Sequence, residues 1–122
     1  MDKSQAIDWF WNGFGLPAYD ENTVPQDAPM PRITYSVATD SFENVVNMDA
    51  SIWYKGRSWK DASLKAEEVA RRLGERGGEV IPLDRGLLWI VKGKPFAQRL
   101  SDPDGMMRRI RLNVQAEYLT PY

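Results

Sequence analysis

The 122-residue sequence contains no histidine and no cysteine. Histidine is the most frequent general base and metal ligand in proteins, so its absence removes the commonest route to acid–base catalysis and metal binding. Without cysteine there is no disulfide, thiolate metal site or cysteine nucleophile, which fits folding in a reducing cytoplasm. We therefore expect a protein that is not an enzyme and that binds neither a metal nor another cofactor.

Long apolar runs and a strong charge of either sign are also missing. No stretch reaches the length of about 20 apolar residues that crosses a membrane. The N-terminal segment MDKSQAIDWFW opens with an acid and lacks a signal-peptide pattern. The formal net charge is −1, which argues against general affinity for nucleic acid. We expect no membrane partner and no specific nucleic-acid partner.

The composition that remains is typical of one globular domain spanning residues 1–122. The hydrophobic content of 43% and the charged content of 27% are ordinary for such a domain. The five tryptophans are more than a core of this size needs. Because tryptophan is enriched at protein interfaces, we expect some of them, Trp9 included, at contact surfaces.

Apolar periodicity predicts two helices. The first is expected near residues 3–13, where Asp2 and Gln5 have the spacing of a capping box. The second is expected over residues 59–73, where it begins after Ser58 and carries one clean apolar stripe.

Strict alternation of apolar and polar residues predicts strands over residues 32–39, 45–55 and 106–119, the first two as a hairpin. Two short apolar runs, residues 79–84 and 87–92, predict a further hairpin. Helices and strands that are each apolar on one side fit a two-layer α+β domain. In that domain a largely antiparallel five-stranded sheet carries both helices on one face.

Two further segments, residues 18–31 and 93–105, are predicted to be long loops because they are rich in proline, glycine and charge. Pro82 interrupts a strand pattern and is therefore expected on an edge strand. The sheet face opposite the helices is expected to be polar and free for solvent or a partner.

Charged clusters supply the candidate interface. Aromatic residues do not interleave with the arginines along the sequence as they do in single-strand stacking platforms, so we expect protein contacts at the arginine cluster. The acids of the first loop lack the spacing of a calcium loop. The candidate interface residues are Trp9, the acids Asp20, Glu21 and Asp27, and the arginines Arg99, Arg108, Arg109 and Arg111.

One arrangement suggests catalysis. Glu79 and either Lys92 or Lys94 lie on paired strands, as in the carboxylate–lysine set of metal-dependent nucleases, but a second acid is missing. Cross-strand charge pairs are also common on sheet surfaces. Two alternatives to a structural role stay open: a small metal-dependent nuclease, and a nucleic-acid-binding module that uses the arginine cluster.

Three segments carry a family resemblance: LPAYDENTVPQDAPMPRITYSVATDSF, NMDASIWYKGRSW and GLLWIVKGKPFAQRLSDPDGMMRRIRLNVQAEYLTPY. Through phrases such as PRITYSVATDS and IVKGKPFAQR and through the order of elements, essentially the whole chain resembles the tail terminator proteins of long-tailed bacteriophages and prophages. The related tail-to-head joining proteins are similar.

The resemblance implies an α+β subunit that assembles as a hexameric ring on the end of the tail tube. Such a ring stops tube growth and presents a surface to the head connector or stopper protein. The implied location is the head-proximal end of the virion tail, after assembly in the host bacterial cytoplasm. The resemblance implies no cofactor and no catalytic residue. We expect the loops 18–31 and 93–105 to make contacts along the tail axis.

Overall fold

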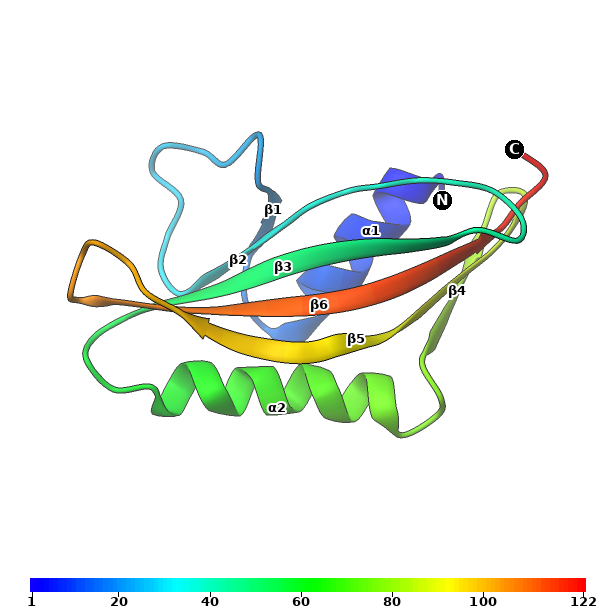
Figure 1. The fold of residues 1–122 in the computed structure, drawn as a ribbon. Coiled ribbons are helices and arrows are strands. Elements are labelled where there is room, and N and C mark those ends of the chain that lie inside the picture. Colours follow the sequence, from blue (N-terminus) through cyan, green and yellow to red (C-terminus); the bar gives the residue numbers. More distant parts are fainter.

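The computed structural model describes residues 1–122, which form a curled six-stranded sheet with two helices on one face (Figure 1). The strand order is β1-β2-β3-β6-β5-β4; β1 and β2 pair in parallel and all other neighbours are antiparallel. The elements are α1 (Lys3–Trp11), the 3-10 helix η1 (Asn12–Phe14), β1 (Ala18–Asp20), β2 (Arg32–Tyr35), β3 (Val45–Lys55), α2 (Lys60–Gly74), β4 (Glu79–Leu83), β5 (Gly86–Leu100) and β6 (Met107–Leu119).

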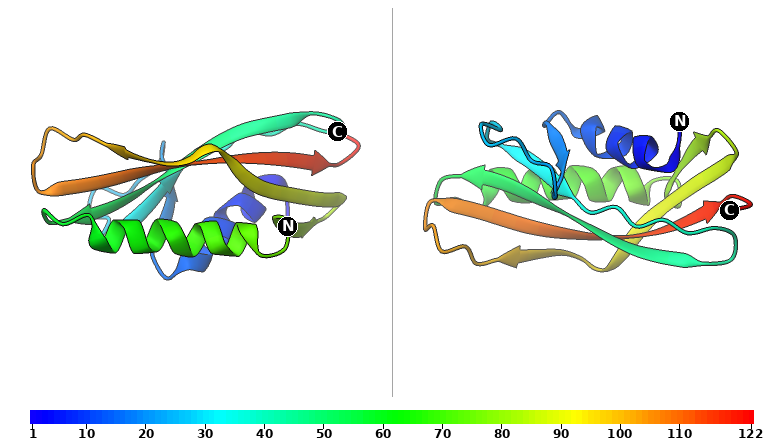
Figure 2. Two further views of the ribbon diagram at one scale, coloured as in Figure 1. Left: turned by 60° about the horizontal axis from the view of Figure 1, so that its bottom comes forward. Right: turned by 90° about the horizontal axis from the view of Figure 1, so that it is seen from above.

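The expected α+β class and the placement of both helices on one side are confirmed (Figure 2). The expected count of five strands is wrong, because β1 lies inside the segment predicted as a loop. The Asn12 side chain fixes this strand: its Oδ1 accepts from the Ala18 amide at 3.1 Å and its Nδ2 donates to the Ala18 carbonyl at 3.3 Å. Three residues are too few to show an alternation, so the sequence pattern does not reveal β1.

The second predicted loop is also partly wrong, since β5 continues through it to Leu100. Gly93 and Pro95 lie in a break in register between Lys92 and Ala97. Pairing with β6 resumes at Ala97 opposite Leu112. Glycine and proline signal the end of a strand in a sequence, but a β-bulge accommodates both. Only residues 101–106 remain as the connection between β5 and β6.

The strand predicted over residues 32–39 ends earlier, at Tyr35. Ser36 takes over the pairing with β3 through its side chain, because its hydroxyl donates to the Asp49 carbonyl at 3.1 Å and accepts from the Asp49 amide at 3.0 Å. The hairpin of β2 and β3 and the edge position of Pro82, which lies in the outermost strand β4, are confirmed.

The helix starts differ in their capping. At α1 the predicted capping box is present: the Asp2 carboxylate accepts from the Gln5 amide at 2.8 Å, and Gln5 Oε1 accepts from the Asp2 amide at 2.9 Å. At α2 the N-cap is Trp59, which provides no side-chain cap. The preceding residue, Ser58, still binds the start of the helix, because its hydroxyl accepts from the Lys60 amide at 3.1 Å. The buried stripe adds the packing that stabilises α2.

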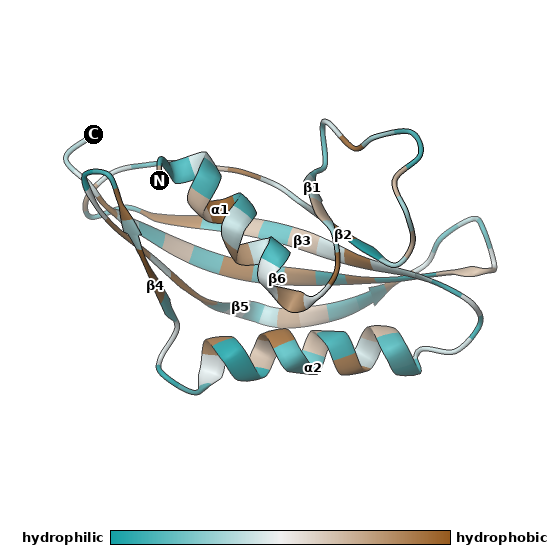
Figure 3. Cartoon of the chain, turned by 180° about the vertical axis from the view of Figure 1, so that it is seen from behind, coloured by the Kyte–Doolittle hydropathy of each residue, from teal (hydrophilic) through white to brown (hydrophobic).

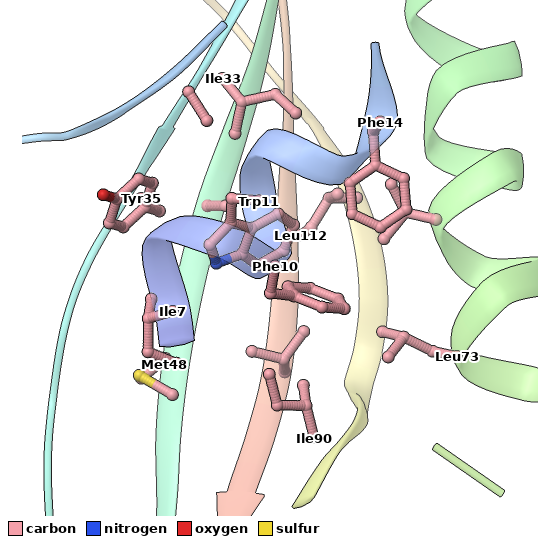
Figure 4. Packing of buried hydrophobic residues seen from close by; sticks show 14 of the residues in the cluster. Ile7, Phe10, Trp11, Phe14, Ile33, Tyr35, Met48, Leu73, Ile90 and Leu112 are labelled. Carbon is pink, nitrogen blue, oxygen red and sulfur yellow. The ribbon is translucent and has the colours of Figure 1, made fainter. Parts of the chain in front are cut away.

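The core is one cluster of 23 buried side chains between the helices and the sheet (Figures 3 and 4). Figure 4 shows Phe10, Trp11 and Phe14 packed edge to face over the sheet, with the Phe10 and Trp11 ring centroids 4.9 Å apart. Edge-to-face contacts add to the stabilisation that burial alone provides. No helix of the structure has the length and apolar character needed to cross a membrane.

Candidate functional site

The face of the sheet opposite the helices is uncovered, and we call it the open face. Strands β3 and β6 lie in front of α1 in Figure 1 and behind it in Figure 3, so the helix covers one side only. Alternation places one set of residues of the long strands on the open face. This set includes Asn47, Asp49, Ser51 and Trp53 of β3 and Arg109, Arg111, Asn113, Gln115 and Glu117 of β6.

Intramolecular polar contacts occupy the middle of the open face. Arg111 Nε pairs with Asp49 Oδ2 at 2.9 Å, and Arg109 Nε donates to Ser51 Oγ at 2.9 Å. The Arg109 guanidinium also lies 4.7 Å from the centroid of the Trp53 ring. Both arginines therefore contact β3 residues of the same chain.

One end of the open face is apolar and exposed. Register places Val45, Glu117, Trp89 and Val80 in one row across β3, β6, β5 and β4. Leu87 lies in the next row, opposite Leu119. Val45, Val80, Leu87 and Trp89 are 59%, 57%, 39% and 40% exposed, and we call these four residues the apolar patch. Exposed apolar residues gathered at one end of a sheet face, here with Glu117 between Val45 and Trp89, indicate a contact surface.

The apolar patch is not among the candidate interface residues predicted from the sequence. Its signal is the continuous run LLWIV, which is apolar at both alternate positions, so it places apolar residues on both faces of β5. A strand of that kind needs cover on two sides. Here the helices cover only the side of Leu88 and Ile90, which are fully buried.

The four candidate arginines were predicted to form one cluster. In the structure they divide between the two faces of the sheet. Arg109 and Arg111 lie on the open face, whereas Arg99 and Arg108 lie on the helix side. There the two guanidinium groups lie 5.0 and 5.3 Å from the centroid of the Trp59 ring. Aromatic residues do not interleave with the arginines along the sequence, but the fold places Trp59, which is distant in sequence, against Arg99 and Arg108. The premise drawn from the sequence is therefore wrong for the folded chain.

The acidic candidates remain apart from these arginines. Asp20 ends β1, and its carboxylate accepts from the Asn22 amide at 2.9 Å. Glu21 and Asp27 are exposed, and none of the three acids makes an ion pair. Trp9 is 50% exposed on α1, on the helix side, with the Arg72 guanidinium 5.7 Å from its ring centroid.

The proposed carboxylate–lysine set is not assembled. Glu79 lies opposite Ile90 in the hairpin rather than opposite a lysine. Its carboxylate pairs with Arg72 Nη2 at 3.0 Å instead. No group of three or more acidic, histidine or cysteine side chains in the structure is arranged to hold a metal ion.

The ionisable groups with perturbed pKa values are three tyrosines, and two of them, Tyr35 and Tyr118, donate hydrogen bonds within the chain. Burial raises the pKa of Tyr118 to about 12, and its hydroxyl donates to the Ala38 carbonyl at 2.7 Å. Burial, together with a hydrogen bond to Asp8, raises the pKa of Tyr35. Burial also raises the pKa of Tyr54, with a smaller contribution from Asp61. All three raised pKa values favour the neutral hydroxyl.

No protein-family model, curated protein or solved structure matches the chain. The interpretation of the site therefore rests on the side chains of this chain, and these can form apolar, ionic and stacking contacts. They comprise an apolar patch at one end of the open face, an internally paired polar centre on the same face, and Arg99 and Arg108 stacked on Trp59 on the helix side.

Proposed function

We propose that this chain is a structural subunit that assembles into a ring on the end of a bacteriophage tail tube. In this role the ring stops polymerisation of the tube protein and offers a joining surface to the head connector or stopper protein. A hexamer is the ring size that the family resemblance implies. The protein then resides at the head-proximal end of the virion tail and needs no cofactor.

The observation that carries this proposal is the apolar patch on a sheet face that no element of the chain covers. Val45 and Val80 are each more than half exposed, although 23 other residues of the same small domain form a closed core. Exposing apolar surface is unfavourable in water, and such patches are typical of surfaces that become buried on assembly. An assembly subunit accounts for this feature without any further group.

The test has two readouts. Sedimentation velocity over a wide concentration range, with negative-stain images of the most concentrated sample, is expected to show a species of about six subunits. Adding the protein to the polymerising cognate tube protein is expected to shorten the tubes and to place density at one tube end. Tubes of unchanged length without added density would overturn the proposed function.

The nucleic-acid alternative makes a different prediction that the same preparation tests. Arg99 and Arg108 flanking Trp59 combine cationic and stacking groups, and binding through them would weaken steeply as salt increases. We expect no such binding in a fluorescence anisotropy titration with labelled single-stranded DNA at low salt. Salt-sensitive binding at micromolar concentrations would favour this alternative.

A further inference from the structure

Opposite ends of the long strands differ in charge. Close to the apolar patch, the turn before β3 and the β4–β5 turn bring acids to one end, because the Phe42 amide donates to the Thr120 carbonyl at 3.1 Å. Figure 1 shows the two chain termini at this same end. The acids here are Asp2, Asp40, Glu43, Asp84 and Glu117. The cations are Lys3, Arg85 and the N-terminal ammonium of Met1, which pairs with Asp84 at 2.8 Å.

Glu117 is the most informative of these acids. It lies between Val45 and Trp89 in the row across the sheet, and its carboxylate makes no ion pair within the chain. Glu43 likewise has no ion pair. A carboxylate beside exposed apolar side chains suits a partner that brings both apolar surface and a cation.

The other end of the sheet presents such a surface. The β5–β6 connection projects there beside the segment that joins β3 to α2 (Figures 1 and 2), and the Gly56 amide donates to the Met106 carbonyl. Met106 is 48% exposed at this tip. The side chains of Lys55, Arg57 and Arg99 make no ion pair. We call these four residues the basic tip.

Two acids also lie at the tip, and local bonds hold both of them. The Asp102 carboxylate accepts from the Asp104 amide, and the Asp104 carboxylate accepts from the Met106 amide, each at 2.9 Å. They shape the turn, while the Lys55 and Arg57 side chains make no hydrogen bond or ion pair and the Arg99 guanidinium lies against the Trp59 ring. Methionine suits a protruding contact because its flexible, polarizable side chain adapts to apolar surfaces.

The basic tip and the apolar patch cannot meet within one molecule. Glu117 of β6 lies eleven positions after Met106, a distance of about 36 Å at about 3.3 Å per residue. We propose that the basic tip of one copy of this chain binds the apolar patch and surrounding acids of the next copy. Charge complementarity and matching apolar surface at the two ends support this occupant.

A contact between two different surfaces is heterologous. Each copy that joins leaves one free patch and one free tip, so association continues until the copies close into a ring or form a filament. This inference rests on the proposed function for the ring outcome, but the contact itself is testable without tail tubes.

The absence of cysteine in the chain permits a clean cross-linking test. Val80→Cys in the patch and Met106→Cys at the tip replace exposed side chains, so both variants are expected to fold, as far-UV circular dichroism checks. Under mild oxidation the double variant is expected to give a ladder of dimers, trimers and larger species on non-reducing gels. An equimolar mixture of the two single variants is expected to give a heterodimer and nothing larger.

The matched control joins Met106→Cys with Leu64→Cys, which replaces a 55% exposed residue on α2 outside the patch. Cross-linking of the Val80/Met106 pair no greater than this control would overturn the inference, and so would homodimers of Val80→Cys alone as the main product. Tube termination by a protein that fails this test would leave the proposed function standing. A cross-linked ladder from a protein that does not shorten tubes would leave the contact standing and remove the proposed function.

Discussion

Arg72 and Glu79 form an ion pair of 3.0 Å between α2 and β4. The same guanidinium lies 4.9 Å from the centroid of the Phe14 ring and donates to the Gly13 carbonyl at 3.2 Å. One side chain therefore connects α2, the 3-10 helix η1 and the edge strand β4.

Replacing Arg72 by alanine is expected to lower the free energy of unfolding by about 2 kcal/mol, since it removes the packing of the guanidinium and leaves the half-buried Glu79 carboxylate without its partner. Urea denaturation followed by tryptophan fluorescence measures the change. Glu75→Ala, at the end of the same helix, is the control and is expected to change the free energy by less than about 0.5 kcal/mol. Equal effects of the two substitutions would show that Arg72 acts only as a surface residue.

Alanine substitutions at three glycines distinguish the cost of backbone strain from the cost of steric clash. At Gly86, where φ is 119°, a β-carbon would lie 2.0 Å from the Leu119 carbonyl oxygen, so alanine is disfavoured by both effects. At Gly56, where φ is 124°, a β-carbon meets no atom within 4 Å. At Gly105 the space is open as well and φ is not left-handed.

Alanine at Gly86 is therefore expected to destabilise the fold by about 3 kcal/mol or more, and alanine at Gly56 by about 1–2 kcal/mol. Alanine at Gly105 is expected to lie within about 0.5 kcal/mol of the parent protein. Thermal unfolding of the three variants gives the order directly. A Gly86 variant as stable as the Gly105 variant would contradict the close approach of the β4–β5 turn to β6.

Tyr118 makes the stability depend on alkaline pH. Its pKa in the folded chain is about 12, above the ordinary value of 10.0, so the folded state retains a proton that the unfolded state loses between these values. The stabilisation is complete below pH 10 and is lost as pH rises toward 12, by at most about 1.4 kcal/mol per pH unit.

The Tyr118→Phe variant lacks this titration and also lacks the hydrogen bond to the Ala38 carbonyl. It is expected to be less stable than the parent by about 1 kcal/mol at pH 8, and this difference is expected to vanish and then reverse in sign between pH 10 and pH 12, because the parent loses about 2 kcal/mol over that interval. Urea unfolding at intervals from pH 8 to pH 12 tests this. A difference that stays constant over the whole range would mean that burial does not raise the pKa of Tyr118.

The sequence predicted those parts of the fold that a repeated local pattern specifies. Two helices, the long strands β3 and β6 and the β4–β5 hairpin all show alternation or a stripe over several residues. Strand β1 does not, because three residues paired to Ile33–Tyr35 and anchored by the Asn12 side chain depend on contacts distant in sequence. The extension of β5 past Gly93 is hidden for a similar reason, since the bulge exists only opposite β6.

The candidate site was less predictable, because contact surfaces are defined by what the fold leaves uncovered. Arg99 and Arg108 lie close together in sequence near Arg109 and Arg111, but strand alternation sends the two pairs to opposite faces. Trp59 meets the first pair only through the turn that follows β3. The sequence shows that Trp89 is apolar. It does not show that Trp89 is 40% exposed, because this follows from the packing of both helices on the other face of the sheet.

Introducing a charge at Val80 is expected to change how copies of the chain associate. Val80→Glu and Val80→Lys both remove an exposed apolar side chain from the patch, and at 57% exposure neither is expected to alter the fold. Loss of apolar contact is common to the two variants, so both are expected to associate more weakly than the parent. The lysine variant also places a cation where the basic tip binds, and like charges at an interface are unfavourable.

We therefore expect Val80→Lys to associate more weakly than Val80→Glu by at least about fivefold at low salt. The difference is expected to decrease as salt is added, because screening shortens the range of the repulsion. Sedimentation velocity at two salt concentrations measures both effects. If the lysine variant associates as well as the glutamate variant, or better, then the surface that reaches the patch is not basic and a partner of different charge occupies it.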